Sequence, residues 1–413
     1  MRTVGLIVEY NPFHNGHLYH LRRSVAVTRA DAVVAVMSGN FLQRGEPALA
    51  GKRARTEMAL RGGCDLVIEL PVSYATHAAE WFAYGAVSML DATGVVDALC
   101  FGSESGEIAA LRRIAAVAAH EPAVLKERLA ERLRRGQSYP AAYSAALRGC
   151  FEAAGDAEAA AFPLEQPNNT LGLHYLIALE RLGSPIEPFT IRREKAGYNE
   201  RAVTDGAIAS ATALRKLLNE QRHPEAIAPY VPASTLAILE REWRAGRAPL
   251  GWHAFAGKLF HMLVRADAAE LASCRDVGEG LEHRIKQCLP LLPSLDFEQL
   301  VDAVKTKRYT RTRLQRALLS ILLGLRKEEA LPALLEDGLR YIRVLGFNDK
   351  GQALLKRMRD CAKLPVLLGS ARPPARFRQL ELDAAASAVY ALGYDAPAPR
   401  DIASDFYEPP VRI

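Results

Sequence analysis

The sequence predicts an α/β protein in which a doubly wound parallel sheet of five strands is followed by an all-helical domain. Short apolar runs rich in β-branched residues recur about every 30 residues near the N-terminus, the length of one βαβ unit. Each run is continuous rather than alternating, as in strands covered by helices on both faces. Beyond about residue 225 no such run is found, and amphipathic patterns with Leu and Ala faces take over.

The first hundred residues alternate between strand and helix. The expected strands cover 3–8, 32–37, 66–70 and 98–101, and the helices between them cover 15–27, 51–61 and 78–90. Two boundaries carry clear stop signals, because Gly62 and Gly63 end the second helix and Pro71 ends the third strand. Right-handed crossovers then make a doubly wound sheet the natural arrangement.

The rest of the chain completes this sheet and adds helices. Residues 107–160 are rich in Ala, Arg and Glu and are interpreted as a helical insertion. A helix over 169–182, a fifth strand over 186–191 and a helix over 211–219 complete a first domain, 1–225. A Pro-containing stretch near residue 225 marks the junction with the helical domain, 226–413.

Composition is that of an ordinary globular protein. The 413 residues are 49% hydrophobic and 24% charged, with a formal net charge of +6, which is only weak support for a nucleic-acid partner. No apolar stretch reaches the roughly 20 residues of a membrane span, and no signal peptide is recognised, so we expect a cytoplasmic protein without a membrane partner. The six cysteines form no C-x-x-C pair, and no metal-binding residue is predicted.

The turn after the first strand carries the strongest chemical signal. It contains His14, Gly16 and His17 in an H-x-G-H pattern. A helix N-terminus offers unpaired N–H groups to anions, and a glycine lets a nucleotide approach the backbone. Two imidazoles three residues apart share one helix face and can donate hydrogen bonds to phosphate oxygens. The alternative, two ordinary capping histidines, is weakened by the position of the pattern after the first strand, where such sheets bind ligands.

This pattern resembles the mark of the nucleotidylyltransferase superfamily, which has a Rossmann-like fold. That superfamily has a second motif, approximately I-S-S-T-x-I-R, and residues 209–215 (ASATALR) resemble it with two replacements. Ser210 and Thr212 are hydroxyls at a helix start that can cap the helix or bind phosphate, and Arg215 can hold phosphate oxygens in a fork. Plain N-capping with a surface arginine is the alternative.

Longer segments resemble the tRNA(Met) cytidine acetate ligase family over nearly the whole chain. The matching segments are 5–17, 37–41, 101–104, 167–169 and 308–313. The resemblance implies an enzyme that activates acetate with ATP as acetyl-adenylate and releases pyrophosphate. The acetyl group then passes to N4 of the wobble cytidine of elongator tRNA(Met). It also implies that Mg²⁺ accompanies ATP through the phosphates, without a dedicated protein cage. No protein nucleophile is needed, because acetate itself attacks the α-phosphate.

The same resemblance assigns ATP contacts. They comprise Ile7, Val8, Glu9, Tyr10, Asn11, Pro12, Phe13, His14, Asn15, Gly16, His17, Leu18, Tyr19 and His20, together with Gly102, Asn169 and Arg192. The ATP-binding candidates also include Arg193, the neighbour of Arg192, and Ser210, Thr212 and Arg215 from the second motif of the superfamily. His14 and His17 are the catalytic candidates. Asn168 is an adjacent alternative to Asn169, and Arg193 to Arg192.

Three of these positions also make sense from the residues themselves. Gly102 ends the fourth strand at the carboxyl edge of the sheet, where ligands dock, although a simple turn glycine would look the same. Asn169 offers a donor and an acceptor, or merely caps the next helix. Arg192 or Arg193 ends the fifth strand and could clamp phosphate, or be a solvated charge.

A basic stretch in the helical half predicts contact with RNA. Its candidate tRNA-binding residues are Lys305, Lys307, Arg308, Tyr309, Arg311, Arg313 and Arg316, and no acid lies among them. Cations for phosphates and an aromatic ring for stacking are what RNA binding requires. A solvated helix face is the alternative.

Three functions remain in competition. The acetate ligase leads, and elongator tRNA(Met), acetate and ATP are its expected partners, with no protein partner evident. A small-molecule adenylyl- or cytidylyltransferase would leave the basic helical half unexplained. A non-enzymatic RNA-binding protein is disfavoured by the intact H-x-G-H pattern.

Overall fold

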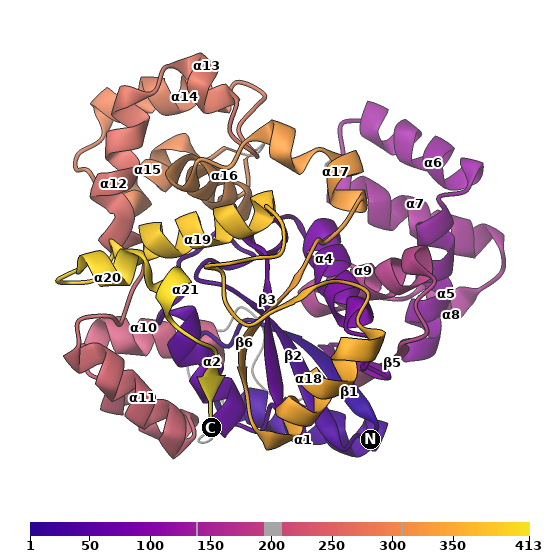
Figure 1. Cartoon of the computed structure of the whole chain (residues 1–413). Helices are drawn as coiled ribbons and strands as arrows, with labels where there is room; N and C mark the ends of the chain where they lie inside the picture. Colours follow the sequence, from indigo (N-terminus) through magenta and orange to yellow (C-terminus); the bar gives the residue numbers. More distant parts are fainter. Residues whose placement is uncertain (138, 194–208, 307–308) are drawn as a thin grey trace.

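The computed structural model describes residues 1–137, 139–193, 209–306 and 309–413. One eight-stranded sheet runs through the centre of the molecule (Figure 1). The strands are β1 (Thr3–Val8), β2 (Ala32–Ser38), β3 (Leu66–Leu70), β4 (Ala98–Ser103), β5 (Glu187–Arg192), β6 (Ile342–Phe347), β7 (Val366–Leu367) and β8 (Val411–Arg412). Their order is β5-β4-β1-β2-β3-β6-β7, and β8 pairs with β6.

The first five strands confirm the predicted parallel sheet. Each pairs in parallel with its neighbours, and β1 lies between β4 and β2. The chain therefore leaves β1 toward β2 and β3 on one side and later reaches β4 and β5 on the other. This reversal of direction creates the crevice at the carboxyl ends of β1 and β4 where doubly wound sheets bind ligands.

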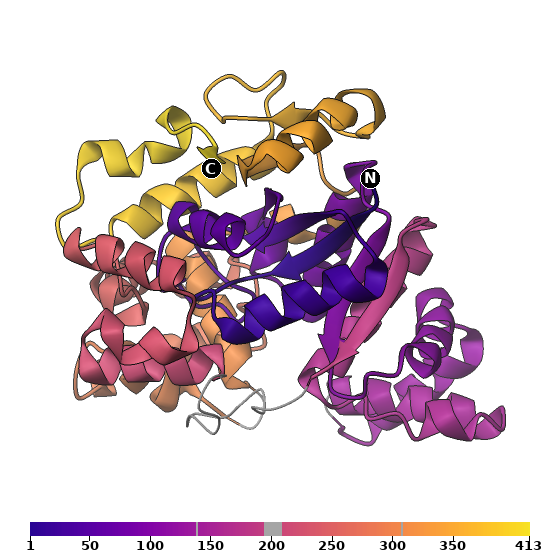
Figure 2. The ribbon, with the colours of Figure 1, turned by 90° about the horizontal axis from the view of Figure 1, so that it is seen from below.

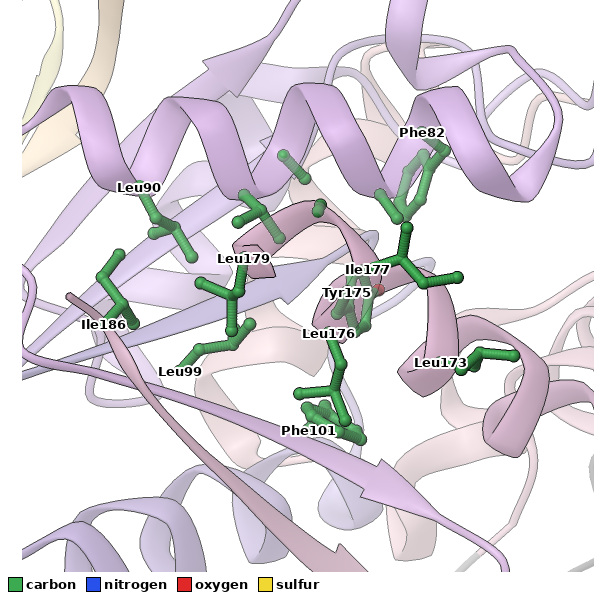
Figure 3. Packing of buried hydrophobic residues seen from close by; sticks show 14 of the residues in the cluster. Phe82, Leu90, Leu99, Phe101, Leu173, Tyr175, Leu176, Ile177, Leu179 and Ile186 are labelled. Atoms are coloured by element: carbon green, nitrogen blue, oxygen red, sulfur yellow. The ribbon is translucent and has the colours of Figure 1, made fainter. Parts of the chain in front are cut away.

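Helices cover both faces of the sheet. One face packs on α4 (Ala79–Ala92), α9 (Pro167–Leu182) and α18 (Asp349–Cys361). In Figure 3, side chains of α4 and α9 interlock with Leu99 and Phe101 of β4. The other face packs on α1 (Asn15–Thr28) and α2 (Lys52–Arg61). The same apolar cluster extends to α10 (Ala211–Gln221) and to α11 (Ala233–Arg244), which packs on α2. Figure 2 shows α1 lying across this second face.

Two helical groups flank this sandwich on opposite sides (Figure 1). The predicted insertion forms α5 (Ile108–His120), α6 (Ala123–Arg134), α7 (Tyr139–Ala153) and α8 (Ala157–Ala160). The second group has its own apolar core and consists of α12 (Trp252–Arg265), α13 (Ala268–Ala272), α14 (Leu281–Cys288), α15 (Phe297–Val304), α16 (Arg311–Leu323) and α19 (Arg378–Ala391). Trp252 stacks on Phe297 in that core, with ring centroids 4.1 Å apart.

Short elements connect these groups. They are α3 (Val72–Ala75), α17 (Pro332–Glu336), α20 (Pro399–Ile402), α21 (Ser404–Tyr407) and the 3-10 turns η1 (Pro224–Tyr230), η2 (Leu289–Leu291) and η3 (Lys327–Ala330). None of the helices in the described ranges is long and apolar enough to cross a membrane.

The expectation that no strand follows residue 225 is wrong. β6 adds to β3 in antiparallel pairing and brings β7 and β8 with it, so the sheet has eight strands rather than five. The reason is a buried charge in β6. Arg343 contacts Glu69 of β3 (3.0 Å) and Asp405 (2.8 Å), and Lys52 of α2 contacts the same two carboxylates at 2.7 and 2.9 Å. This cluster joins the C-terminal segment to the sheet, and its arginine interrupts the apolar run that marks a strand.

Candidate active site

The first turn holds its two histidines by hydrogen bonds to the backbone. His14 is the N-cap of α1, and its Nδ1 accepts a hydrogen bond from the Gly16 amide (3.0 Å). The Nδ1 of His17 in turn accepts from the His14 amide (3.4 Å), which completes a capping box. The two rings stack with centroids 3.7 Å apart, so both imidazoles lie at the positive end of the helix.

Burial keeps these imidazoles neutral. It lowers the pKa of His14 to about 3, assisted by the positive charges of Arg193 and Arg215. The pKa of His17 is held well below its ordinary value, first by burial and then by the neighbouring rings and Arg193. Burial and Arg193 lower the pKa of His20 to about 4. Since the Nδ1 of neutral His14 accepts a hydrogen bond, its Nε2 carries the proton and can donate to a ligand.

The remaining residues of the 7–20 segment mostly form the wall behind the histidines. Tyr10 and Phe13 are buried and pack edge to face, with centroids 4.7 Å apart. Ile7, Val8 and Leu18 pack against the two sheet cores, while Tyr19 is exposed. The Asn11 Oδ1 accepts from the Leu49 amide (2.7 Å), Asn15 donates to the Pro229 carbonyl (3.1 Å), and Pro12 lies between the two asparagines.

The structure separates Arg192 from Arg193. The Arg193 side chain lies beside Gly102, because a Cβ added to Gly102 would be 3.3 Å from Cγ of Arg193. The positive charge of Arg193 lowers the pKa of both His14 and His17. Arg192 instead packs against Gly106, where an added Cβ would lie 2.8 Å from Cβ of Arg192. Of the two arginines at the end of β5, Arg193 is therefore the one brought to the histidines.

The second predicted motif converges on the same turn. Ser210 caps α10 by accepting from the Ala213 amide (3.1 Å). One turn later, Arg215 donates through Nη1 to the Asn11 carbonyl (3.1 Å), and its Nη2 lies 3.5 Å from Thr212 Oγ1. A guanidinium from α10 thus reaches the loop that leads into His14.

Asn168 and Asn169 serve the loop after β4. The Asn169 Oδ1 accepts from the amides of Glu104 (3.0 Å) and Ser105 (3.2 Å), and its Nδ2 donates to the Pro163 carbonyl (2.9 Å) and to Gln166 (3.1 Å). The Glu104 carboxylate accepts from the amides of Asn168 and Asn169 and from the Asn168 side chain. With all four bonds of the Asn169 amide group directed at protein, its side chain shapes the loop that follows Gly102.

Sequence reasoning missed Arg55, the most deeply buried cation of the site. Its side chain is fully buried in α2 and donates to the carbonyls of Glu9 (2.6 Å), Ser38 (3.2 Å) and Ala50 (3.0 Å), and also to that of Gly39. It therefore caps the carboxyl ends of β1 and β2 together. Burial lowers the pKa of Arg55 to about 10, so the guanidinium is charged at pH 7. Its position in an Arg- and Lys-rich helix gave no signal that set it apart from a surface arginine.

Glu9 is a second charge-bearing group at this edge, and it is half-buried. Its Oε1 accepts from the Gln43 amide (2.7 Å). Burial raises the pKa of Glu9, and the hydrogen bond from Gln43 and the charge of Arg55 oppose that rise. Glu9 thereby ties the end of β1 to the loop that follows β2.

The basic stretch is partly compensated by acids from other elements. Lys307 and Arg308 lie outside the described residues, and Lys305 is the exposed C-cap of α15. Arg311 pairs with Glu298 (2.7 Å), Arg313 with Glu279 (3.1 Å) and Arg316 with Asp276 (3.5 Å). Tyr309 is buried, and its hydroxyl donates to the Glu279 carbonyl (2.6 Å), so its ring supports Arg313 at 5.3 Å rather than facing solvent.

A doubly wound sheet whose first strand ends in an H-x-G-H turn, faced by two arginines, defines a nucleotidyl transferase-type protein. Comparison with known proteins agrees, since residues 1–405 match the HIGH Nucleotidyl Transferase family. The chain is 41% identical to the tRNA(Met) cytidine acetate ligases of Acetivibrio thermocellus, with 98% of each chain covered, and Caldanaerobacter subterraneus subsp. tengcongensis, with 100% covered. The chain belongs to the HIGH nucleotidyl transferase family and, within it, to the tRNA(Met) cytidine acetate ligase family.

Solved structures give the same result. The apo form of Thermotoga maritima TmcAL superposes with a TM-score of 0.92 at 36% identity, with each chain covered completely. The form of that protein bound with alpha-thio ATP gives a TM-score of 0.90. The predicted α/β fold class and family are thereby confirmed.

The neutral histidines predict a specific pH dependence of stability. Below about pH 6.5 the unfolded chain takes up a proton on His14, whereas the folded protein does so only near pH 3. The unfolded state then binds more protons, so the free energy of unfolding decreases as the pH is lowered. Between pH 7 and pH 5 the decrease is about 2 kcal/mol for one such histidine. In urea unfolding, His14→Gln should lose about 2 kcal/mol less between pH 7 and pH 5 than the wild type.

The control replaces an exposed side chain that does not titrate. Gln299→Ala on α15 should keep the wild-type pH dependence. An unchanged slope in His14→Gln would show that His14 titrates normally in the folded protein.

Proposed function

We propose that this protein is an ATP-dependent ligase that activates acetate as acetyl-adenylate and transfers the acetyl group to N4 of the wobble cytidine of elongator tRNA(Met). Its family supports the reaction class, and the relatives carry the name tRNA(Met) cytidine acetate ligase. The observation that carries the proposal is geometric. The N-terminus of α1, the neutral His14 and His17, Arg193 and Arg215 meet at the carboxyl ends of β1 and β4.

These groups match the needs of adenylation. The triphosphate of ATP would lie at the α1 N-terminus, with Gly102 leaving room for the nucleotide. A carboxylate oxygen of acetate attacks the α-phosphorus, the bond to the bridging oxygen of the β-phosphate breaks, and pyrophosphate leaves. The Nε2–H of His14 and the guanidiniums of Arg193 and Arg215 stabilise the negative charge on the phosphates. Catalysis then rests on positioning and charge stabilisation, without a protein nucleophile.

The second step transfers the acetyl group to RNA. The N4 amine attacks the acetyl carbonyl, the bond to the adenylate oxygen breaks, and AMP leaves while the amine loses a proton. We propose that residues 1–225 bind ATP and residues 226–413 bind tRNA, through the basic stretch around α16. We also propose a cytoplasmic location, because tRNA is the substrate.

Mg²⁺ is proposed to accompany ATP on its phosphates. Within the described ranges, no group of three or more His, Cys, Asp or Glu side chains could hold a metal ion. The steps above assign the protein's own contribution to the imidazole of His14 and the guanidiniums of Arg193 and Arg215.

Replacement of the second histidine tests the first step. His17→Ala removes an imidazole stacked on His14 at the α1 N-terminus. Because His17 closes the capping box and stacks on His14, its loss should misplace the His14 donor and lower acetate-dependent pyrophosphate release by about 100-fold or more. Thermal unfolding checks that the fold is intact. Normal pyrophosphate release by a folded His17→Ala variant would remove this turn from the site.

The basic stretch has its own test. Arg311→Ala with Arg313→Ala should weaken tRNA binding and reduce the slope of log affinity against log salt by about 2, because two phosphate contacts are lost. Pyrophosphate release without RNA should be unchanged. As a control of equal charge change, Arg135→Ala with Arg148→Ala removes two exposed, carboxylate-paired arginines of the insertion. Equal tRNA affinity in both double variants would exclude the α16 surface from the tRNA site.

A further inference from the structure

A short loop after β2 lies directly between the ATP site and helix α16. Residues 42–46 close on themselves, because the Leu42 amide donates to the Glu46 carbonyl (2.9 Å) and the Gly45 amide to the Leu42 carbonyl (2.9 Å). Gly45 has a φ of +74°, and a Cβ added there would lie 2.5 Å from the backbone nitrogen of Arg316. Only glycine allows the loop to rest on the backbone of α16 in this way.

The carboxylate of Glu46 contacts both neighbours. Its Oε2 lies 3.5 Å from Nη2 of Arg215, and its Oε1 accepts from Nε2 of Gln315 at 3.2 Å. Gln315 is buried, at 4% exposure, and lies one turn beyond the Arg311 start of α16. A single side chain thus spans the space between the two proposed binding surfaces.

The far end of this chain of contacts is the phosphate-facing turn. Arg215 donates through Nη1 to the Asn11 carbonyl, three residues before His14. The loop is held at its other side by Gln43, whose amide donates to Glu9 and whose Nε2 donates to the His77 carbonyl (3.0 Å). A movement of α16 would therefore be transmitted to Arg215 through the hydrogen-bonded loop 42–46.

We propose that Glu46 is a positioning residue that links Arg215 in the ATP site to helix α16 through Gln315, so that contacts made on α16 change the affinity for ATP. The inference rests on the proposed function for the identity of the RNA. The hydrogen-bonded path from Gln315 to Arg215 is independent of the proposed function. A long side chain such as Arg215 samples many rotamers unless it is held, and Glu46 keeps the guanidinium directed at the Asn11 loop.

The first experiment uses ATP alone. Calorimetric titration should show about ten-fold weaker ATP binding in Glu46→Ala and about five-fold weaker binding in Gln315→Ala, the size expected for one lost hydrogen bond in a network. Glu46→Gln should restore most of the affinity, because a glutamine can still bridge Arg215 and Gln315. In steady-state pyrophosphate release, these changes should affect KM for ATP more than kcat.

The control is Gln299→Ala, an exposed glutamine on the neighbouring helix α15. It should bind ATP as the wild type does. Wild-type ATP affinity in Gln315→Ala would overturn the proposal. So would a Glu46→Gln variant no better than Glu46→Ala, because Glu46 would then not act by bridging its two neighbours.

The second experiment adds tRNA. Coupling between two sites is reciprocal, so ATP affinity of the wild type should change in the presence of saturating tRNA, by about five-fold or more. In Gln315→Ala that response should be lost or reduced. An equal response in both proteins would overturn the link. If the wild type binds no tRNA, the proposed function fails, while the ATP titrations without RNA still decide whether Gln315 reaches Arg215.

Discussion

The buried guanidinium of Arg55 is the constraint on which the site depends. It satisfies carbonyls at the carboxyl ends of two adjacent strands, β1 and β2, in a place that water does not reach. Each buried carbonyl left without a donor would cost about 1–3 kcal/mol. Because Arg55 fixes the ends of both strands, the turn after β1 can present His14 and His17 at the carboxyl edge of the sheet. For the same reason the loop after β2 can extend to α16.

The proposed chemistry follows from how charge is distributed around this anchor. The imidazole of His14, made neutral by burial, supplies a directional donor, while Arg193 and Arg215 supply full charges from the end of β5 and from α10. Each of these groups comes from a different part of the chain. A polyanion can therefore contact all of them only in the folded protein, where these elements are in place. The C-terminal segment contributes to this order, because the Lys52, Glu69, Arg343 and Asp405 cluster ties it to the same sheet.

Much of this could be predicted from the sequence, and the omissions have physical reasons. The first four strands are continuous apolar runs, and the H-x-G-H turn lies within a few consecutive residues, so both can be recognised from the sequence alone. β6 was missed because its buried Arg343 is paired with carboxylates from distant segments. For the same reason the basic stretch looked uncompensated, although Glu298, Glu279 and Asp276 lie against it in space. The choice between Arg192 and Arg193 depends on which way each side chain leaves β5, which no sequence pattern encodes.

The central claim is that this site uses ATP to place an acetyl group on a cytidine of tRNA. The most direct measurement incubates the purified protein with ATP, Mg²⁺, labelled acetate and bulk tRNA, followed by nucleoside analysis of the RNA. The account predicts label in N4-acetylcytidine, present only when ATP is supplied. ATP consumption with another acid or a phosphoester, and no label in RNA, would contradict it and indicate a small-molecule nucleotidylyltransferase built on the same fold.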